Sequence, residues 1–529
     1  MARHQARETS QHSLRLAFFV LVGSIALATL DPFGLSSSAS AISRDLANAM
    51  LAPYAKPAQR TPPRDPTTGA LPWSGRDDVV VILFDDAFTD EPGVGWPIPY
   101  LEHAWLLGVV GSLDPATVFV DFAFKERSSD AAGFETLRSV VRRLEADGTP
   151  VFFAAPRPTD GDGVLVPLGE DVRLAGDPDR LVLVESLATP GFYPLTIAPP
   201  EGRADSDRWQ SPALRQFLEG CRLGSPAPAT CPSAEAIEAG TAASAFRAPA
   251  WLRWPVSIPG AWHPIGWRQC AMTGPTASER IGWSAKVLGV ALTGGVQGSP
   301  FFDVEDRLQG CPPVATIRAS QVRETSMVAG TAFEDFIRDK HVIIGGQFVS
   351  VFDYVESPVH GLVPGSFFHA VALANLLAYG DEYTREASHL FGPVRLIEAT
   401  LVSIVTIAMI VVGRRLQARA VEEGPEYQGR RSDIGVWLLA SVAVLVLVVT
   451  VAVLSSIRLM IEPINYLGIS GLGVIMVLRF SGPHARKAVS ARRDGSRSPV
   501  PADVAPRLPD AGDSEADRTD DDPTRERSE

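Results

Sequence analysis

Residues 77–88 read DDVVVILFDDAF, and the apolar run inside this stretch decides the fold class. Residues 79–84 are all apolar and rich in β-branched side chains, and the run stops at Asp85 and Asp86. A short apolar run without polar alternation is typical of a strand buried on both faces of a sheet. We therefore expect a mostly parallel sheet covered by helices.

Helical and strand patterns alternate on both sides of a less regular middle. Strand-like runs recur at residues 116–122 (ATVFVDF), 149–154 (TPVFFA) and 341–344. Helical patterns fall at residues 100–111, 137–146 and 366–378. This alternation predicts an α/β domain. We interpret residues 156–260, where only short candidates occur at 180–186, 213–219 and 250–256, as an elaborated half of the same domain.

Three aspartates end two of the predicted strands. Asp85 and Asp86 follow the first strand, and Asp121 lies at the end of the second. Because open α/β sheets bind ligands at the carboxyl ends of their strands, we expect these carboxylates to form a ligand site. The structural alternative is that Asp85 or Asp86 caps the following turn, and that Asp121 bonds to backbone amides or to the indole of Trp96.

Two histidines, His103 and His369, lie on apolar helical stretches and are candidates for the same ligand site. An unperturbed imidazole has a pKa near 6.5, so this pair could respond to external pH. The alternative is that each histidine is packed and hydrogen-bonded in the core. Carboxylates with a histidine could also bind a metal ion and activate water, which leaves an exported metal-dependent hydrolase open. We expect no catalytic residues, no metal and no cofactor.

The N-terminus carries a basic segment and then an apolar run. Residues 1–15 contain three arginines, and residues 16–35 are long enough to cross a hydrocarbon core of about 30 Å. We predict a retained transmembrane anchor at 16–35 behind a cytoplasmic segment at 1–15. A basic start, a short apolar run and a small-residue exit also fit a cleaved secretory signal, and the sequence leaves this open.

Three further apolar runs, at residues 396–413, 434–457 and 464–479, predict three C-terminal transmembrane helices. Arginines gather in the loop at 414–433 and after the last run, and the positive-inside rule places both in the cytoplasm. Residues 36–392 are then one large periplasmic domain of a multi-pass protein in a bacterial inner membrane.

All four cysteines fall in the predicted exported domain, where an even number favours disulfides. They are Cys221, Cys231, Cys270 and Cys311. Pairing of nearest neighbours would join Cys221 to Cys231 and Cys270 to Cys311, although the sequence permits three connectivities. A zinc site is the weaker alternative, because the chain has no CxxC spacing.

Charge and motifs narrow the classes of function. The formal net charge of -13 and the pI near 5.3 argue against a nucleic-acid partner. Residues 480–529 are rich in Pro, Asp and Arg without apolar periodicity, and we expect a disordered cytoplasmic tail in place of a catalytic output domain. GxGxxG, P-loop and GxSxG motifs are absent from the sequence.

Four stretches together resemble the CHASE2 domain, an extracytoplasmic sensor module of bacterial signalling proteins. They are VVVILFDDAF, WPIPYLEHAWLL with Trp96-Pro97 and His103, ATVFVDFAF, and KHVIIGGQFVSVFDYVESPVHGLVPGSFFHAVALANLL with Asp353 and His369. The resemblance covers roughly residues 36–390, thinly between 156 and 330. It implies a membrane-anchored sensor of an unknown extracytoplasmic ligand, followed by three transmembrane helices.

The sensor prediction leaves the partner and the oligomeric state undetermined. We expect the chain to contact the lipid bilayer and to act through a separate signalling partner or through a second copy of itself. A structural or assembly component of a membrane complex and the exported hydrolase remain the alternatives.

Overall fold

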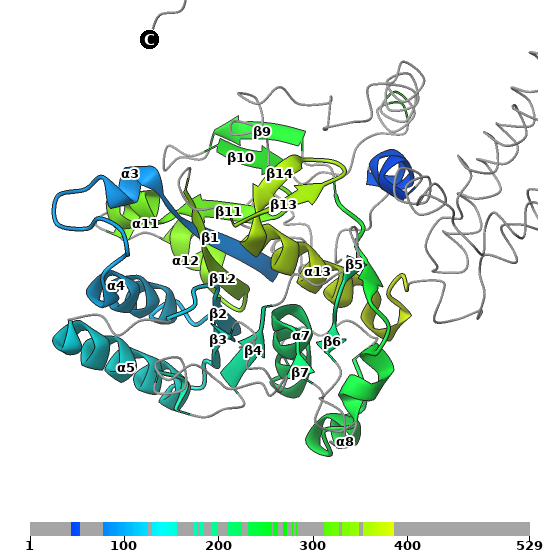
Figure 1. The fold of residues 1–529 in the computed structure, drawn as a ribbon, viewed down its shortest axis with the longest axis horizontal. Helices are drawn as coiled ribbons and strands as arrows, with labels where there is room; N and C mark the ends of the chain where they lie inside the picture. Colours follow the sequence, from blue (N-terminus) through cyan, green and yellow to red (C-terminus); the bar gives the residue numbers. More distant parts are fainter. Residues whose placement is uncertain are drawn as a thin grey trace, which may run out of the picture. The chain divides into compact units, whose positions relative to one another are not determined.

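The structure is a computed structural model (Figure 1), and it describes a part of the chain. The described residues are 44–52, 78–124, 130–155, 174–176, 180–184, 192–197, 209–224, 231–255, 258–262, 268–271, 278, 282, 312–326, 331–348 and 353–385. The predicted membrane segments at 16–35, 396–413, 434–457 and 464–479, the loop at 414–433 and the tail at 480–529 lie outside these residues. Among the helices of the described ranges, none is long and apolar enough to cross a membrane.

Six parallel strands form the central sheet, in the order β11-β1-β12-β2-β3-β4. They are β1 (Val79–Asp85), β2 (Thr117–Val120), β3 (Val151–Ala155), β4 (Leu181–Leu183), β11 (Ala315–Arg318) and β12 (His341–Gln347). Every residue of β1, β2 and β3 is buried, as expected of strands covered on both faces. The α/β class with a mostly parallel sheet is confirmed.

Helices cover both faces of the sheet (Figure 1). Val80, Ile82 and Phe84 of β1 point to the face that holds α4 (Tyr100–Gly111), α5 (Ala131–Ala146), α11 (Ala319–Ser326) and α12 (Thr331–Ile337). Val79, Val81 and Leu83 point to the face that holds α7 (Pro212–Arg222) and α13 (Gly365–Tyr379). The alternation of side chains along β1 therefore divides the core into two layers.

The elaborated middle of the chain contributes to the second layer. Ser211 caps α7 by accepting a hydrogen bond from Leu214 N at 3.3 Å, and Pro212 begins the helix. Two short antiparallel ladders surround α7: β5 (Phe192–Tyr193) pairs with β8 (Ala250–Trp251), and β6 (Thr196–Ile197) pairs with β7 (Trp209–Gln210). Residues of α7 are part of the hydrophobic core on this face of the sheet.

The remaining elements are short and lie outside the central sheet. A helix covers residues 44–51. The other elements are α3 (Asp86–Thr89), α8 (Ala234–Glu238), η6 (Ala242–Phe246), η7 (Gly380–Glu382) and two hairpins, β9 (Ile258–Trp262) with β10 (Arg268–Ala271) and β13 (Tyr354–Ser357) with β14 (Gly361–Pro364). The hairpin β13–β14 leads directly into α13.

Candidate functional site

The predicted carboxylates lie at the carboxyl edge of the sheet, at the ends of two strands that are not neighbours. Strand β12 lies between β1 and β2, so Asp85 and Asp121 follow strands that are two spacings apart, or about 10 Å. The expectation that Asp85, Asp86 and Asp121 form one ligand site stays a prediction. The sequence patterns located the strand ends, but they did not contain the strand order.

Asp85 caps the short helix that follows its strand. Its carboxylate accepts a hydrogen bond from Phe88 N at 3.2 Å and lies 3.6 Å from Arg318 Nε on β11. Burial raises the pKa of Asp85, and the nearby Arg318 opposes this effect. Asp86, the first residue of α3, is partly exposed, and its charge acts on Tyr354. The structural alternative thus describes Asp85.

The side chain of Asp121 points toward α13, whereas that of Asp85 points toward β11. The backbone N of Asp121 donates to Ile344 O at 2.8 Å, which fixes the start of the loop after β2. Its side chain is 8% exposed and its Oδ1 lies 3.8 Å from His369 Nε2. Burial raises the pKa of Asp121 well above its usual range, and the negative charge of Asp353 raises it further. The indole of Trp96 packs on Phe348 at 4.8 Å between ring centroids, instead of against Asp121.

Asp353 and Ser366 complete this group at the first turn of α13. A Cβ on Gly365 would lie 2.6 Å from Asp353 Oδ1, so the carboxylate rests against the Cα of Gly365. A Cβ on Gly345 would lie 2.7 Å from Ser366 Oγ and 3.8 Å from Asp121 Cβ. The two glycines thus allow close approach of the polar side chains. We call Asp121, Asp353, Ser366 and His369 the carboxylate cluster.

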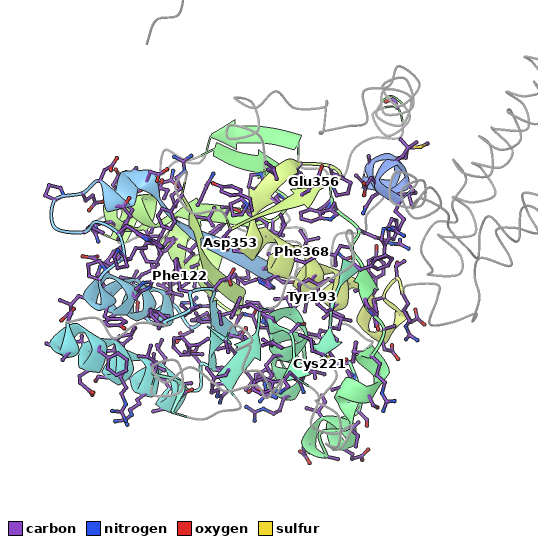
Figure 2. All side chains as sticks on the ribbon, viewed as in Figure 1. Phe122, Tyr193, Cys221, Asp353, Glu356 and Phe368 are labelled. Carbon is purple, nitrogen blue, oxygen red and sulfur yellow. A yellow bond between two sulfur atoms is a disulfide. The ribbon has the colours of Figure 1, made fainter. Side chains whose placement is uncertain are left out.

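His369 connects the carboxylate cluster to the elaborated middle of the chain. Its Nδ1 lies 2.8 Å from Tyr193 Oη, which accepts a hydrogen bond from Ala213 N at 3.4 Å. The Tyr193 hydroxyl is therefore free to donate to Nδ1, and this tautomer directs Nε2–H toward Asp121. Burial lowers the pKa of His369 to about 3, so the ring is neutral at physiological pH. Asp353, Phe368 and Tyr193 are labelled around α13 in Figure 2.

His103 lies on the other face of the sheet from His369. It belongs to α4, and its ring contacts Phe84, Phe122 and Phe124 with centroids 5.0 to 5.2 Å apart. Burial lowers the pKa of His103 to about 3. The prediction of a His103–His369 pair was wrong, because the two helices cover opposite faces. The packed alternative describes His103.

Sequence reasoning missed Asp353, Ser366 and Tyr193 as site residues. Asp353 was recognised only as part of the family resemblance, and Ser366 only as the start of a helical pattern. The available signal was the sequence PGS at residues 364–366, where two small residues begin an otherwise apolar helix. Tyr193 lies in the irregular part of the chain, so its contact with His369 had no signal in the sequence.

The far end of α13 is joined to both ends of the described domain through residues 250–254, which we call the bridging segment. Asn375 of α13 accepts from Arg253 N at 3.1 Å and donates to Arg253 O at 3.2 Å. Asn48, on the helix at 44–51, donates to Leu252 O at 2.7 Å and accepts from Trp254 N at 3.3 Å. Thr384 O accepts from Trp251 N at 2.8 Å. One extended segment therefore contacts the first and the last described elements.

Cys221 and Cys231 form a disulfide with an S–S distance of 1.98 Å, as nearest-neighbour pairing predicted. The predicted partner of Cys270, Cys311, lies outside the described residues, so that pairing stays a prediction. No group of three His, Cys, Asp or Glu side chains arranged to hold a metal ion occurs in the part of the chain that the structure describes.

Comparison with known families gives one match. The CHASE2 domain matches residues 59–412, which is more than half of the chain. This range includes every residue of the carboxylate cluster. No curated protein and no solved structure matches the chain.

Proposed function

The chain belongs to the CHASE2 domain family, an extracytoplasmic sensor family, and on this premise we propose that it is a membrane-anchored sensor acting through a separate partner. In this proposal the carboxylate cluster binds the external ligand, and the chain itself performs no catalysis. The residues that carry the proposal are those of α13.

The supporting observation is that one helix contacts both the carboxylate cluster and the bridging segment. Ser366 and His369 lie in the first turns of α13, and Asn375 lies near its end. Because Asn375 is hydrogen-bonded to Arg253, a shift of α13 would displace the bridging segment. The bridging segment in turn contacts Asn48 and Thr384. A ligand can drive such a shift only by binding one arrangement more tightly than the other.

The two ends of the described domain lead in sequence toward the apolar runs. We propose that residues 16–35, 396–413, 434–457 and 464–479 span the inner membrane and that residues 36–392 lie outside it. The partner would then contact the Arg-rich loop at 414–433 or the tail at 480–529. It is a separate signalling protein or a second copy of the chain.

Hydrogen exchange of the full chain in lipid nanodiscs tests the coupling through α13. Asp121→Asn and Asp353→Asn each remove one charge from the carboxylate cluster. We expect amide exchange at residues 44–51, 252–254 and 383–385 to change at least threefold, while exchange in β3 stays constant.

The matched control is Asp147→Asn, which makes the same substitution at the C-cap of α5, beside the amino edge of the sheet. It should leave exchange at both ends of the domain unchanged. If amide exchange at all three segments stays as in the wild type in both cluster variants, α13 does not transmit a change in the charge of the cluster.

Reporter fusions test the membrane topology separately. Fusions at residues 200, 424, 459 and 500 should report periplasm, cytoplasm, periplasm and cytoplasm. This order follows from the apolar runs and from the arginines at 414–433. An exported reporter at 424 or 500 would contradict the four-span topology.

A further inference from the structure

The hydroxyl of Ser366 is buried without a hydrogen-bond partner among the described residues. Ser366 is 1% exposed, and its Oγ bonds to none of the described groups. A Cβ added to Gly345 of β12 would lie within 4 Å of both Ser366 Oγ and Asp121 Cβ. The side chain of Ser366 therefore points to the junction of β12 and β2. Buried hydroxyls are normally paired, so an unpaired one beside a carboxylate indicates the place of a ligand atom.

In the described ranges no lysine or arginine pairs with either carboxylate of the cluster, and the neighbouring His369 ring is neutral. His369 Nε2 lies 3.8 Å from Asp121, which is beyond hydrogen-bond distance. Asp353 is exposed, whereas the Asp121 side chain is almost fully buried. The cluster thus offers one outer and one inner carboxylate with a hydroxyl beside the inner one.

This arrangement discriminates between classes of ligand. An anion is disfavoured, because the carboxylate of Asp353 already lies at the first turn of α13, where the helix dipole would attract a negative group. A divalent metal ion is disfavoured, because the described residues lack a third carboxylate, imidazole or thiolate arranged to coordinate it. A primary ammonium group has three N–H donors and one positive charge, which match two carboxylates and one hydroxyl.

We propose that the carboxylate cluster recognises a ligand through a primary ammonium group, held by Asp121, Asp353 and Ser366. The inference rests on the proposed function, because it names the ligand class of the same site. Tyr193 and His369 would hold the inner wall in place without contributing charge.

Ammonium binding should release a proton from the cluster. The titratable groups that face Asp121 are Asp353, His369 and Tyr193. Burial raises the pKa of Asp121, so without ligand its carboxyl group holds a proton up to a higher pH than an exposed aspartate does. The ammonium group needs the ionised carboxylate. The affinity should therefore fall about tenfold per pH unit as the pH drops below the raised pKa, and level off above it.

Isothermal titration calorimetry of the full chain in nanodiscs of zwitterionic lipid tests this proposal. The probes are n-butylammonium, tetramethylammonium and Ca²⁺, each as the chloride at constant ionic strength. We expect butylammonium to bind with release of up to one proton, measured from two buffers of different ionisation enthalpy. Asp353→Asn and Ser366→Ala should each weaken this binding at least tenfold, while Asp147→Asn should leave it unchanged.

Several binding results would overturn the ammonium assignment. They are equal binding of tetramethylammonium, which has no N–H groups; saturable binding of Ca²⁺ in place of butylammonium; and binding of butylammonium that the cluster variants do not weaken. The absence of any butylammonium binding would also overturn it. In each case the exchange experiment above decides independently whether the cluster is coupled to the ends of the domain.

Discussion

Three buried histidines link the stability of the domain to pH. Burial lowers the pKa of His103 and His369 to about 3 and that of His341 to about 4. In the unfolded chain each imidazole takes up a proton below about 6.5. Their contribution to stability is therefore complete above pH 6.5 and is lost as the pH falls toward 4 and 3. The raised pKa of Asp121 acts in the opposite sense, because its contribution is present at low pH and is lost as the pH rises above 3.8.

His103→Phe should reduce the loss of stability in acid. The histidine lies among three phenylalanine rings, where a fourth apolar ring avoids the cost of protonation. Between pH 7.5 and 5.0 the wild type should lose about 2 kcal/mol more of its free energy of unfolding than the variant, since one proton counts about 1.4 kcal/mol per pH unit. Chemical denaturation of the full chain at both pH values measures the difference. An equal loss in both proteins would show that His103 is not neutral in the fold.

Asp85 and Asp121 show how far sequence can predict single residues. Asp85 is the last residue of β1 and Asp121 directly follows β2, so their positions at the carboxyl edge were predicted correctly. Their partners were not predictable in the same way. Asp85 bonds within its own turn, to Phe88, so a local pattern suffices. Asp121 lies 3.8 Å from His369 and is influenced by the charge of Asp353, and only the folded arrangement brings these residues to β2.

At the scale of elements, a single arginine joins α11 to two other parts of the first layer. Arg323 of α11 forms ion pairs with Glu91, in the loop after α3, and with Glu102 of α4. Its guanidinium also lies over the rings of Phe88, at 4.3 Å, and Trp105, at 4.7 Å. A planar group with several donors can pair with two carboxylates and stack on aromatic rings at once.

Arg323→Lys should therefore destabilise the domain although it keeps the charge. A lysine ammonium cannot reproduce the two ion pairs and the stacking together, and we expect a loss of about 1–2 kcal/mol. Denaturant midpoints of the full chain measure the loss. Arg138→Lys is the control, because among the described residues Arg138 pairs with the exposed Glu135 on its own helix and with no other carboxylate. Equal midpoints for Arg323→Lys and the wild type would show that charge alone holds these elements together.

The elements that could be predicted are those with a buried periodic pattern. Strands β1, β2 and β3 and helices α4, α5 and α13 all follow from apolar runs or helical spacing. Strand β11 was missed because only Ile317 of its four residues is buried. A strand at the edge of the sheet does not need the continuous apolar run by which a central strand is recognised. The hairpin β13–β14 was missed because each strand has only four residues and neither shows a regular alternation of buried and exposed side chains.

At the scale of the whole molecule, two buried asparagines connect the first described helix and α13 to one backbone segment. Asn48 bonds to residues 252 and 254, and Asn375 bonds to residue 253. Successive peptide groups of an extended segment alternate in direction, so two side chains on opposite sides can satisfy them all. No pattern in the sequence predicts such contacts, because residues 252–254 have no partner strand among the described residues.

Asn48 and Asn375 should be energetically coupled through the bridging segment. Each substitution to Ala leaves buried backbone groups of the bridging segment unpaired, which should cost about 1–3 kcal/mol. Because both side chains hold the same segment, release by the first substitution should reduce the cost of the second. The loss of local stability in the double variant should therefore be smaller than the sum of the two single losses by about 1 kcal/mol.

Hydrogen exchange at residues 252–254 and 383–385 of the full chain measures the local free energy of opening. Thr136→Ala, on the exposed side of α5, is the control. Strict additivity of the two substitutions would mean that the two ends of the domain are held independently, and the bridging segment could not then carry a signal from α13 to residues 44–51.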